Sequence, residues 1–222
     1  MNIISNTIST TYEKILLHQI HKQGAAFPGH VALVLSEGDI LDNTGFLKLA
    51  PFTQWCIQLG VKRITVYISI INIDDIYKEI SSEFTAKIID KLSHVKARVN
   101  IYTRDSCQCI NEHYDSPLLN ISVGVGGKYE LTQTTIQIME KIQASEIQPE
   151  DITPELIESH LLFKHEPDMV IRSGGKQLTD FLIWQSAYSE LYFTDVSWIN
   201  FRYIDLLRAI RDYQKRKRKF GR

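Results

Sequence analysis

The chain has 222 residues, of which 44% are hydrophobic and 23% charged, and its formal net charge at pH 7 is -1. This length and composition fit one globular domain with a sizeable core and exclude a disordered chain, and the near-neutral charge argues against a general binder of nucleic acid. Cys56, Cys107 and Cys109 are an odd number without the spacing of a zinc site, so we expect Cys107 and Cys109 to form a reduced pair in a loop. No segment reaches the roughly 18 apolar residues of a membrane span. We therefore expect a cytoplasmic protein that can still work peripherally at a membrane surface.

In chain order, the hydrophobic pattern alternates between helix-type and strand-type segments, after a leading amphipathic helix that contains residues 16–21. Apolar or β-branched runs typical of strands lie at 30–35, 64–70, 99–102, 118–123, 169–171 and 191–193. Segments with helical periodicity lie at 46–59, 75–92, 129–142, 154–162 and 178–188. Thr153 and Pro154 read as an N-cap followed by proline at the first helical position. The pattern predicts a single α/β domain over residues 1–222, with a mainly parallel central sheet covered by helices on both faces and a basic tail at 214–222.

One stretch near the C-terminal end points to a diphosphate ligand. Residues 167–195 run from a buried-type strand into a cationic glycine turn, Arg172-Ser173-Gly174-Gly175-Lys176, and on to a second apolar strand. A diphosphate carries several charges, which cationic side chains and closely approaching backbone N–H groups can hold. Taken singly, these residues also have a structural explanation, since Arg172 could pair with a surface carboxylate and Glu190 could be a solvated helix-end residue.

Residues 167–195 resemble, almost residue for residue, the C-terminal signature of the cis-prenyltransferases, the undecaprenyl and dehydrodolichyl diphosphate synthase family. The likeness extends to residues 28–35, 55–67 and the Gly126-Gly-Lys-Tyr129 turn. Members of that family condense isopentenyl diphosphate onto an allylic diphosphate, with magnesium, as dimers with a hydrophobic tunnel. The resemblance implies the same fold, a substrate-binding role for the glycine turn and for Thr179, and a metal-binding role for Glu190.

The family's other signature is missing from this chain. After their first strand, active members carry Asp-Gly-Asn-Gly-Arg-Trp-Ala, where this chain has Ser36-Glu-Gly-Asp-Ile-Leu-Asp42. Ser36 stands in place of the metal-binding aspartate and Ile40 in place of the phosphate-binding arginine, which removes stabilisation typically worth several kcal/mol at the leaving group. Glu37 or Asp39 offers a shifted carboxylate. Lys176 is a partial replacement for an arginine that family members carry after the glycine pair.

The C-terminal segment keeps a basic end. Tyr203, Leu206, Ile210 and Tyr213 fall on one helical face, and the helix continues into the basic tail. A similar tail in the family crosses the dimer interface to the partner's isopentenyl diphosphate, and the residues that would do so here are Lys219, Gly221 and Arg222. Without the family resemblance, a solvated helix end favoured by the helix dipole would be the preferred interpretation.

A changed first loop beside a retained tail resembles the accessory subunit of heteromeric cis-prenyltransferases, the Nogo-B receptor type of dolichol synthesis. We therefore expect a chain that is inactive alone, that pairs with a catalytic homologue holding most of the Mg²⁺, and that lends its tail to the partner's isopentenyl diphosphate site. In isolation we expect a homodimer formed through the segment from Trp184 to Phe193 and the neighbouring helix. Two alternatives stay open: an autonomous homodimeric polyprenyl diphosphate synthase with a variant magnesium loop, and a non-enzymatic isoprenoid-diphosphate-binding or scaffold protein.

Overall fold

A computed structural model describes residues 2–22, 26–41, 43–70, 74–175, 177–178 and 180–216. The chain folds around a seven-stranded sheet with the strand order β4-β3-β5-β2-β1-β6-β7. The strands are β1 (His30–Ser36), β2 (Arg63–Ser69), β3 (Arg98–Tyr102), β4 (Cys107–Ile110), β5 (Leu118–Val123), β6 (Met169–Ser173) and β7 (Glu190–Thr194). Neighbouring strands are parallel except for the antiparallel pair β3 and β4. The predicted α/β domain with a mainly parallel sheet is confirmed.

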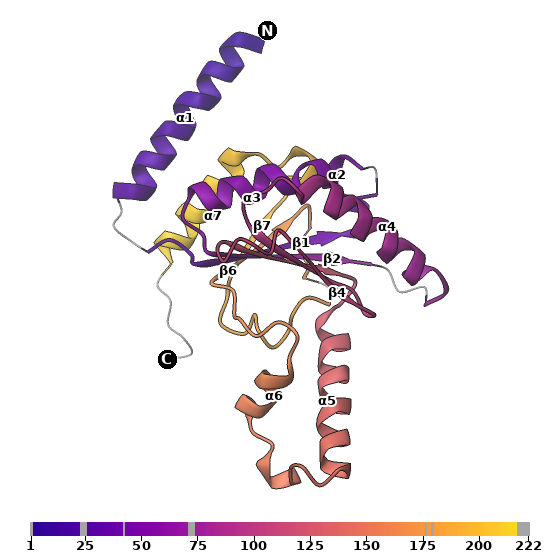
Figure 1. Cartoon of the computed structure of the whole chain (residues 1–222). Helices are drawn as coiled ribbons and strands as arrows, with labels where there is room; N and C mark the ends of the chain where they lie inside the picture. The colour runs from indigo at the N-terminus through magenta and orange to yellow at the C-terminus, as the bar shows by residue number, and fades with distance from the viewer. Residues whose placement is uncertain are drawn as a thin grey trace.

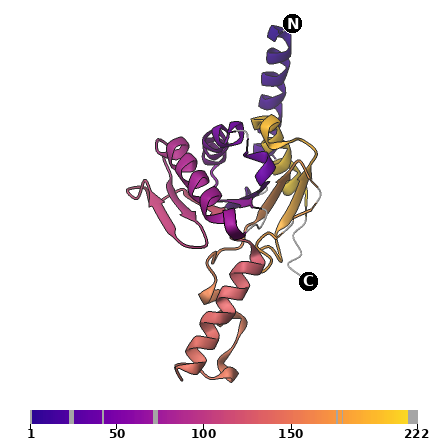
Figure 2. The same cartoon turned by 90° about the vertical axis from the view of Figure 1, so that its right-hand side faces the viewer.

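The helices are α1 (Asn2–Lys22), α2 (Thr44–Leu47), α3 (Leu49–Gln58), α4 (Asp74–Leu92), α5 (Gly127–Gln143), α6 (Pro154–His160) and α7 (Tyr203–Lys215). Figure 1 shows α2, α3, α4 and α7 on one face of the sheet, while α5 and α6 project from the other face as an arm. The main core lies under the first group of helices, and α1 packs on α7 through the fully buried Leu16 and Ile20. Turned by 90°, the molecule shows α1 and the arm projecting in opposite directions (Figure 2).

Loops together with the start of α5 cover the second face of the sheet. A smaller apolar cluster there joins Ala32, Val34 and Val170 of the central strands to Phe163, Phe181 and Leu182. Residues 183–188 form turns. The predicted helix at 178–188 is therefore wrong, because Phe181 and Leu182 are held on the sheet while the Gln185 side chain donates to the Phe163 carbonyl oxygen at 2.8 Å.

Two other local predictions also need correction. The segment at 46–59 forms two helices, α2 and α3, which meet at Lys48. Cys107 and Cys109 lie on the edge strand β4 and not in a loop, and both are free thiols. The predicted helix start at Thr153 is confirmed, since its hydroxyl accepts the Leu156 N–H at 3.2 Å. Within the described ranges, no helix combines the length and the apolar character needed to cross a membrane.

His30, the first residue of β1, is buried in a neutral form. Its Nδ1–H donates to the Glu166 carbonyl oxygen at 3.0 Å, and its Nε2 lies 2.9 Å from the Thr65 hydroxyl. Burial lowers the pKa of His30 from its ordinary value of 6.5 to about 4.

This pKa shift predicts a specific loss of stability in acid. The unfolded chain takes up the proton near pH 6.5 and the folded chain only near pH 4, so the free energy of unfolding should fall as the pH is lowered across that interval, by up to about 3 kcal/mol. Urea unfolding between pH 4 and pH 7.5 measures it. His30→Gln, which keeps a donor and an acceptor without titrating, should flatten the profile. Parallel profiles for the two proteins would contradict the assignment to His30.

Candidate active site at the switch point of the sheet

The strand order reverses direction between β1 and β6. From β1 the chain moves to β2 on one side, whereas β6 and β7 lie on the other side. In open parallel sheets, ligands bind outside the carboxyl ends of the strands at such a switch point. Here those ends are Ser36 of β1 and Ser173 of β6, and Val34 pairs with Arg172 in the register. The loop with the altered signature, after β1, and the turn with the retained signature, after β6, therefore lie next to each other.

The first loop, residues 36–41, brings the carboxylate of Asp39 back to the end of β1. After Ser36 the chain makes a short 3₁₀ turn, Glu37–Asp39. Asp39 Oδ2 accepts hydrogen bonds from the Ser36 N–H at 2.8 Å and from the Ser36 hydroxyl at 2.6 Å. The same oxygen lies 3.5 Å from Nη1 of Arg172. Asp39 is one of the two shifted carboxylates considered from the sequence. Its carboxylate thus lies at the end of β1, beside the position of the family's aspartate.

Arg172 is 8% exposed and holds three parts of the chain together. Nη1 donates to the Val34 carbonyl oxygen at 3.0 Å and faces Asp39, while Nε donates to the Gln177 carbonyl oxygen at 3.2 Å. A Cβ atom on Gly175 would lie 3.2 Å from both Nε and Nη2, so the guanidinium packs closely against this glycine. Arg172 pairs with a carboxylate, as the structural explanation expects, but that carboxylate is largely buried.

The glycine turn, residues 172–175, is tied into the sheet by its other polar groups. The fully buried Ser173 donates its hydroxyl to the Val196 carbonyl oxygen at 2.7 Å. Gly174 adopts φ +68°, which favours glycine, and its N–H donates to the Thr194 carbonyl oxygen at 2.9 Å. Oδ1 of Asp39 would lie 3.8 Å from a Cβ on Gly174, so the first loop and the glycine turn face each other.

Neither Ile40 nor Lys48 places a positive charge beside Asp39. Ile40, at the position of the family's arginine, is fully buried in the main core. Lys48 donates to the Phe201 carbonyl oxygen at 2.6 Å, and burial lowers its pKa. Among the described residues, Arg172 is therefore the cation that this site shows next to Asp39.

Glu190 lies away from this site in the same chain. It pairs with Met169 at the start of β6, whereas Thr194 pairs with Ser173 at the end, a separation of about 13 Å at 3.3 Å per residue. Its Oε2 accepts from Nη1 of Arg216 at 3.1 Å. Within one chain, Glu190 therefore cannot share a metal ion with Asp39, and its metal-binding role stays a prediction.

Five predicted site residues, namely Lys176, Thr179, Lys219, Gly221 and Arg222, lie outside the described residues. Their substrate-binding roles stay predictions. The described part of the chain contains no cluster of three or more His, Cys, Asp or Glu side chains that could hold a metal ion. Mg²⁺ is often bound by one or two carboxylates together with substrate phosphates, so Asp39 beside a bound diphosphate fits this ion.

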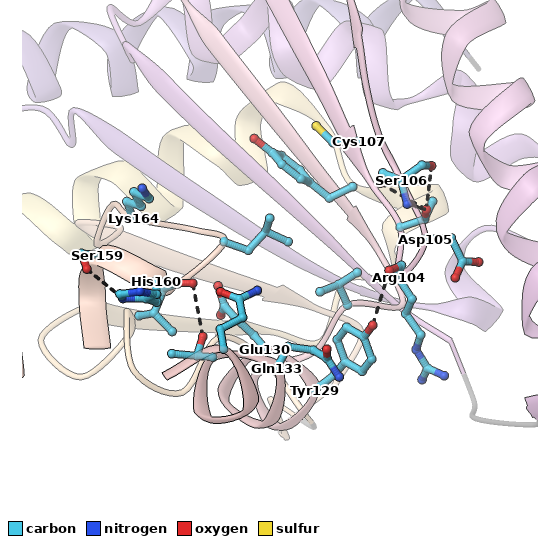
Figure 3. Close-up of a pocket in the computed structure, with 17 residues that line it drawn as sticks. Arg104, Asp105, Ser106, Cys107, Tyr129, Glu130, Gln133, Ser159, His160 and Lys164 are labelled. Atoms are coloured by element: carbon cyan, nitrogen blue, oxygen red, sulfur yellow. Dashed lines mark hydrogen bonds between the residues drawn. The ribbon is translucent and has the colours of Figure 1, made fainter. Parts of the chain in front are cut away.

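Sequence reasoning missed a separate cleft of about 530 Å³ at the carboxyl ends of β3 and β5 (Figure 3). The guanidinium carbon of Arg104 lies 4.2 Å from the ring centre of Tyr77 and 5.1 Å from that of Tyr129. On the α5 side, the buried Glu130 accepts the Phe163 N–H at 2.8 Å, and burial raises the pKa of Glu130. None of the residues that line this cleft belongs to the glycine turn or the first loop. The cleft is therefore separate from the glycine turn and the first loop, and the Gly126-Gly-Lys-Tyr129 motif lies partly on its α5 wall.

Comparison with known proteins decides the family. A family model described as "Putative undecaprenyl diphosphate synthase" matches residues 69–221, more than half of the chain. The chain belongs to the cis-prenyltransferase family. The cis-prenyltransferase resemblance of residues 167–195 is thereby confirmed at the level of the family.

Relatives and structures agree with this assignment. A tritrans,polycis-undecaprenyl-diphosphate synthase (geranylgeranyl-diphosphate specific) of Methanocaldococcus jannaschii is 34% identical over 248 aligned positions, which cover 95% of this chain and 88% of that protein. The protein of the same name from Picrophilus torridus is 30% identical over 264 positions that cover 100% of each chain. These alignments exceed 222 positions, so the present cis-prenyltransferase lacks segments that its relatives carry.

The crystal structure of lavandulyl diphosphate synthase from Lavandula x intermedia shares the fold. Its TM-score is 0.72 at 22% identity, over 88% of this chain and 99% of that one.

The buried pair of Arg172 and Asp39 should behave as a coupled unit. Arg172→Met leaves Asp39 without its cation and should lower the free energy of unfolding by about 3 kcal/mol, with a smaller loss of about 2 kcal/mol for Asp39→Asn. In the double variant the losses should fall short of their sum by about 1 kcal/mol or more. Urea unfolding of the four proteins measures this. The pair of the partly exposed Lys87 and the exposed Glu83 is the matched control, with an expected coupling below about 0.5 kcal/mol. Strict additivity at Arg172 and Asp39 would show that the pair is not coupled.

Proposed function

We propose that this cis-prenyltransferase condenses isopentenyl diphosphate with an allylic diphosphate to form a long-chain polyprenyl diphosphate. The observation that carries the proposal is the Asp39 carboxylate at the end of β1, 3.5 Å from Arg172 at the switch point of the sheet. Relatives that span nearly the whole chain are named as undecaprenyl diphosphate synthases specific for geranylgeranyl diphosphate, which supports that allylic substrate. They also favour an autonomous synthase over an accessory subunit.

In this proposal the residues at the switch point act on the allylic diphosphate. Condensation joins C4 of isopentenyl diphosphate to C1 of the allylic chain and releases diphosphate and a proton. Mg²⁺, the family's metal ion, would neutralise the charge that develops on the leaving diphosphate. Asp39 would hold that ion, and Arg172 would exchange its contact with Asp39 for a phosphate oxygen. Ser36 would keep the carboxylate oriented through its N–H and hydroxyl.

Turnover by the purified chain tests the autonomous synthase. With radiolabelled isopentenyl diphosphate, geranylgeranyl diphosphate and Mg²⁺, the chain alone should form polyprenyl diphosphate, which is resolved by chromatography. Asp39→Ala should lower kcat by roughly 10²–10³-fold, the usual cost of a lost electrostatic group at a reacting centre. Glu83→Ala, an exposed carboxylate on α4, is the control and should leave kcat unchanged. A folded wild-type chain without any product would refute the autonomous synthase.

A second candidate function is the accessory subunit of a heteromeric cis-prenyltransferase. The observation that favours it is that Ile40 is buried in the core and Lys48 donates to the Phe201 carbonyl oxygen, so neither residue offers a phosphate-binding cation beside the first loop. On this reading the chain gains turnover only when it is mixed with a homologue whose first loop reads Asp-Gly-Asn-Gly-Arg-Trp. A scaffold protein, the third alternative, would show no turnover under either condition.

The accessory reading also predicts the effect of shortening the tail. Deleting residues 219–222 should leave assembly unchanged, since an exposed basic end contributes little to stability. The mixed enzyme should use isopentenyl diphosphate less well, by about 10- to 150-fold in kcat/KM, which corresponds to a charge-assisted contact of about 1.5–3 kcal/mol. Steady-state kinetics of full-length and shortened complexes measures the change. Equal kinetic constants would restrict the tail to a solvated helix end.

In both readings we propose a dimer that uses the segment 184–193. Tyr188 and Phe193 expose 56% and 42% of their surface there, beside the half-exposed Ile183. Aromatic side chains of this kind are enriched at protein interfaces. Light scattering of the chain, alone and with the homologue, distinguishes a homodimer and a heterodimer from a monomer.

A further inference from the structure

The atoms nearest to a Cβ built on Gly126 or Gly127 belong to the segment 180–183, which explains why this turn carries glycines. A Cβ atom on Gly126 would lie 2.1 Å from Oδ2 of Asp180 and 2.7 Å from the Asp180 carbonyl oxygen. A Cβ atom on Gly127 would lie 2.8 Å from the Ile183 N–H. Both glycines therefore let the segment 180–183 approach the backbone at the start of α5 more closely than any other residue would allow.

Asp180 serves as the cap of α5, although it lies 52 residues further along the chain. Its Oδ1 accepts the Lys128 N–H at 2.9 Å, and its carbonyl oxygen accepts the Gly127 N–H at 2.9 Å. These N–H groups belong to the first turn of the helix, where no intrahelical acceptor exists. A carboxylate is also favoured at this positive end of the helix dipole.

Hydrogen bonds also hold the chain on either side of Asp180. Towards the glycine turn, the Gln177 carbonyl oxygen accepts Nε of Arg172 at 3.2 Å. In the other direction, Gln185 Nε2 donates to Oε2 of Glu130 in the first turn of α5 at 2.9 Å. Gln177 therefore contacts the glycine turn, and Gln185 contacts α5, on the two sides of Asp180.

We propose that Asp180 is a positioning residue, which fixes the glycine turn relative to α5 and thereby sets the affinity of that turn for a diphosphate group. The effect on affinity depends on the proposed function of the turn, whereas the positioning role depends on the contacts of Asp180 alone. Because α5 belongs to the projecting arm, the first turn of this helix then connects the arm to the segment that contains Asp180.

Hydrogen exchange of the whole chain tests the positioning without any substrate. Asp180→Ala should speed exchange of the amides in 127–131 and 177–183 by roughly five- to tenfold, the effect of losing a side-chain cap. Asp180→Asn retains an acceptor at Oδ1 and should stay within about twofold of the wild type. Gly126→Ala should resemble Asp180→Ala, because its Cβ displaces the carboxylate. Gly29→Ala is the matched control, since its Cβ would make only an ordinary contact of 3.5 Å.

A binding and kinetic measurement tests the consequence for the glycine turn. Asp180→Ala should raise KM for the allylic diphosphate about five- to tenfold while kcat changes less than threefold, and Asp180→Asn should restore KM. If the wild-type chain proves to have no turnover, the proposed function fails separately, and calorimetric titration with inorganic diphosphate and Mg²⁺ replaces KM as the readout. Unchanged exchange in Asp180→Ala, or equally fast exchange in Asp180→Asn, would overturn the positioning role. Faster exchange with unchanged KM or diphosphate affinity would overturn its effect on the turn.

Discussion

Arg172 is buried at the carboxyl end of β6, and its charge must be neutralised where little water reaches it. The guanidinium meets this requirement with the Val34 carbonyl of β1, the Gln177 carbonyl beyond the glycine turn and the carboxylate of Asp39. The Arg172 side chain thus contacts the central strand β1, the first loop and the chain just beyond the glycine turn. The relative positions of these three parts, and with them the candidate site, depend on this set of contacts.

The same contacts suggest how a site can be folded and still accept an anion. Hydrogen bonds to two carbonyl oxygens hold the guanidinium in place, whereas the contact with Asp39 is the longest of the three at 3.5 Å. A phosphate oxygen that approaches Nη1 would replace one anion by another, so the buried cation stays neutralised throughout. Asp39 would remain held by the N–H and hydroxyl of Ser36 during this exchange. Binding then requires a local substitution of partners rather than an unfolding of the loop.

Much of the fold could be predicted because the central strands are apolar runs that the sheet buries on both faces, as at residues 30–35. The helix expected at 178–188 failed because Asp180 and Gln185 bond to α5, and such long-range partners leave no periodic signal. The short edge strand β4 is largely exposed and therefore lacks the apolar run that marks the other strands. At the site, the motif correctly marked Arg172, but only the fold shows that Asp39, not a neighbour along β6, is its partner. Glu190 belongs to the same motif as Arg172 and yet lies far from it. Glu190 is the first residue of the five-residue strand β7, whereas Arg172 lies near the end of β6.

The two departures in the first loop also depend on each other. Ser36 donates both its N–H and its hydroxyl to the same oxygen of Asp39, which only a donor side chain at position 36 allows. The family's aspartate at this position would bring a second carboxylate to within hydrogen-bonding distance of Asp39, where like charges repel and Arg172 could neutralise only one of them. A carboxylate at position 39 therefore requires a residue such as serine at position 36. Asp39 lies three residues beyond the position of the family's aspartate, and the 3₁₀ turn places its carboxylate at the end of β1.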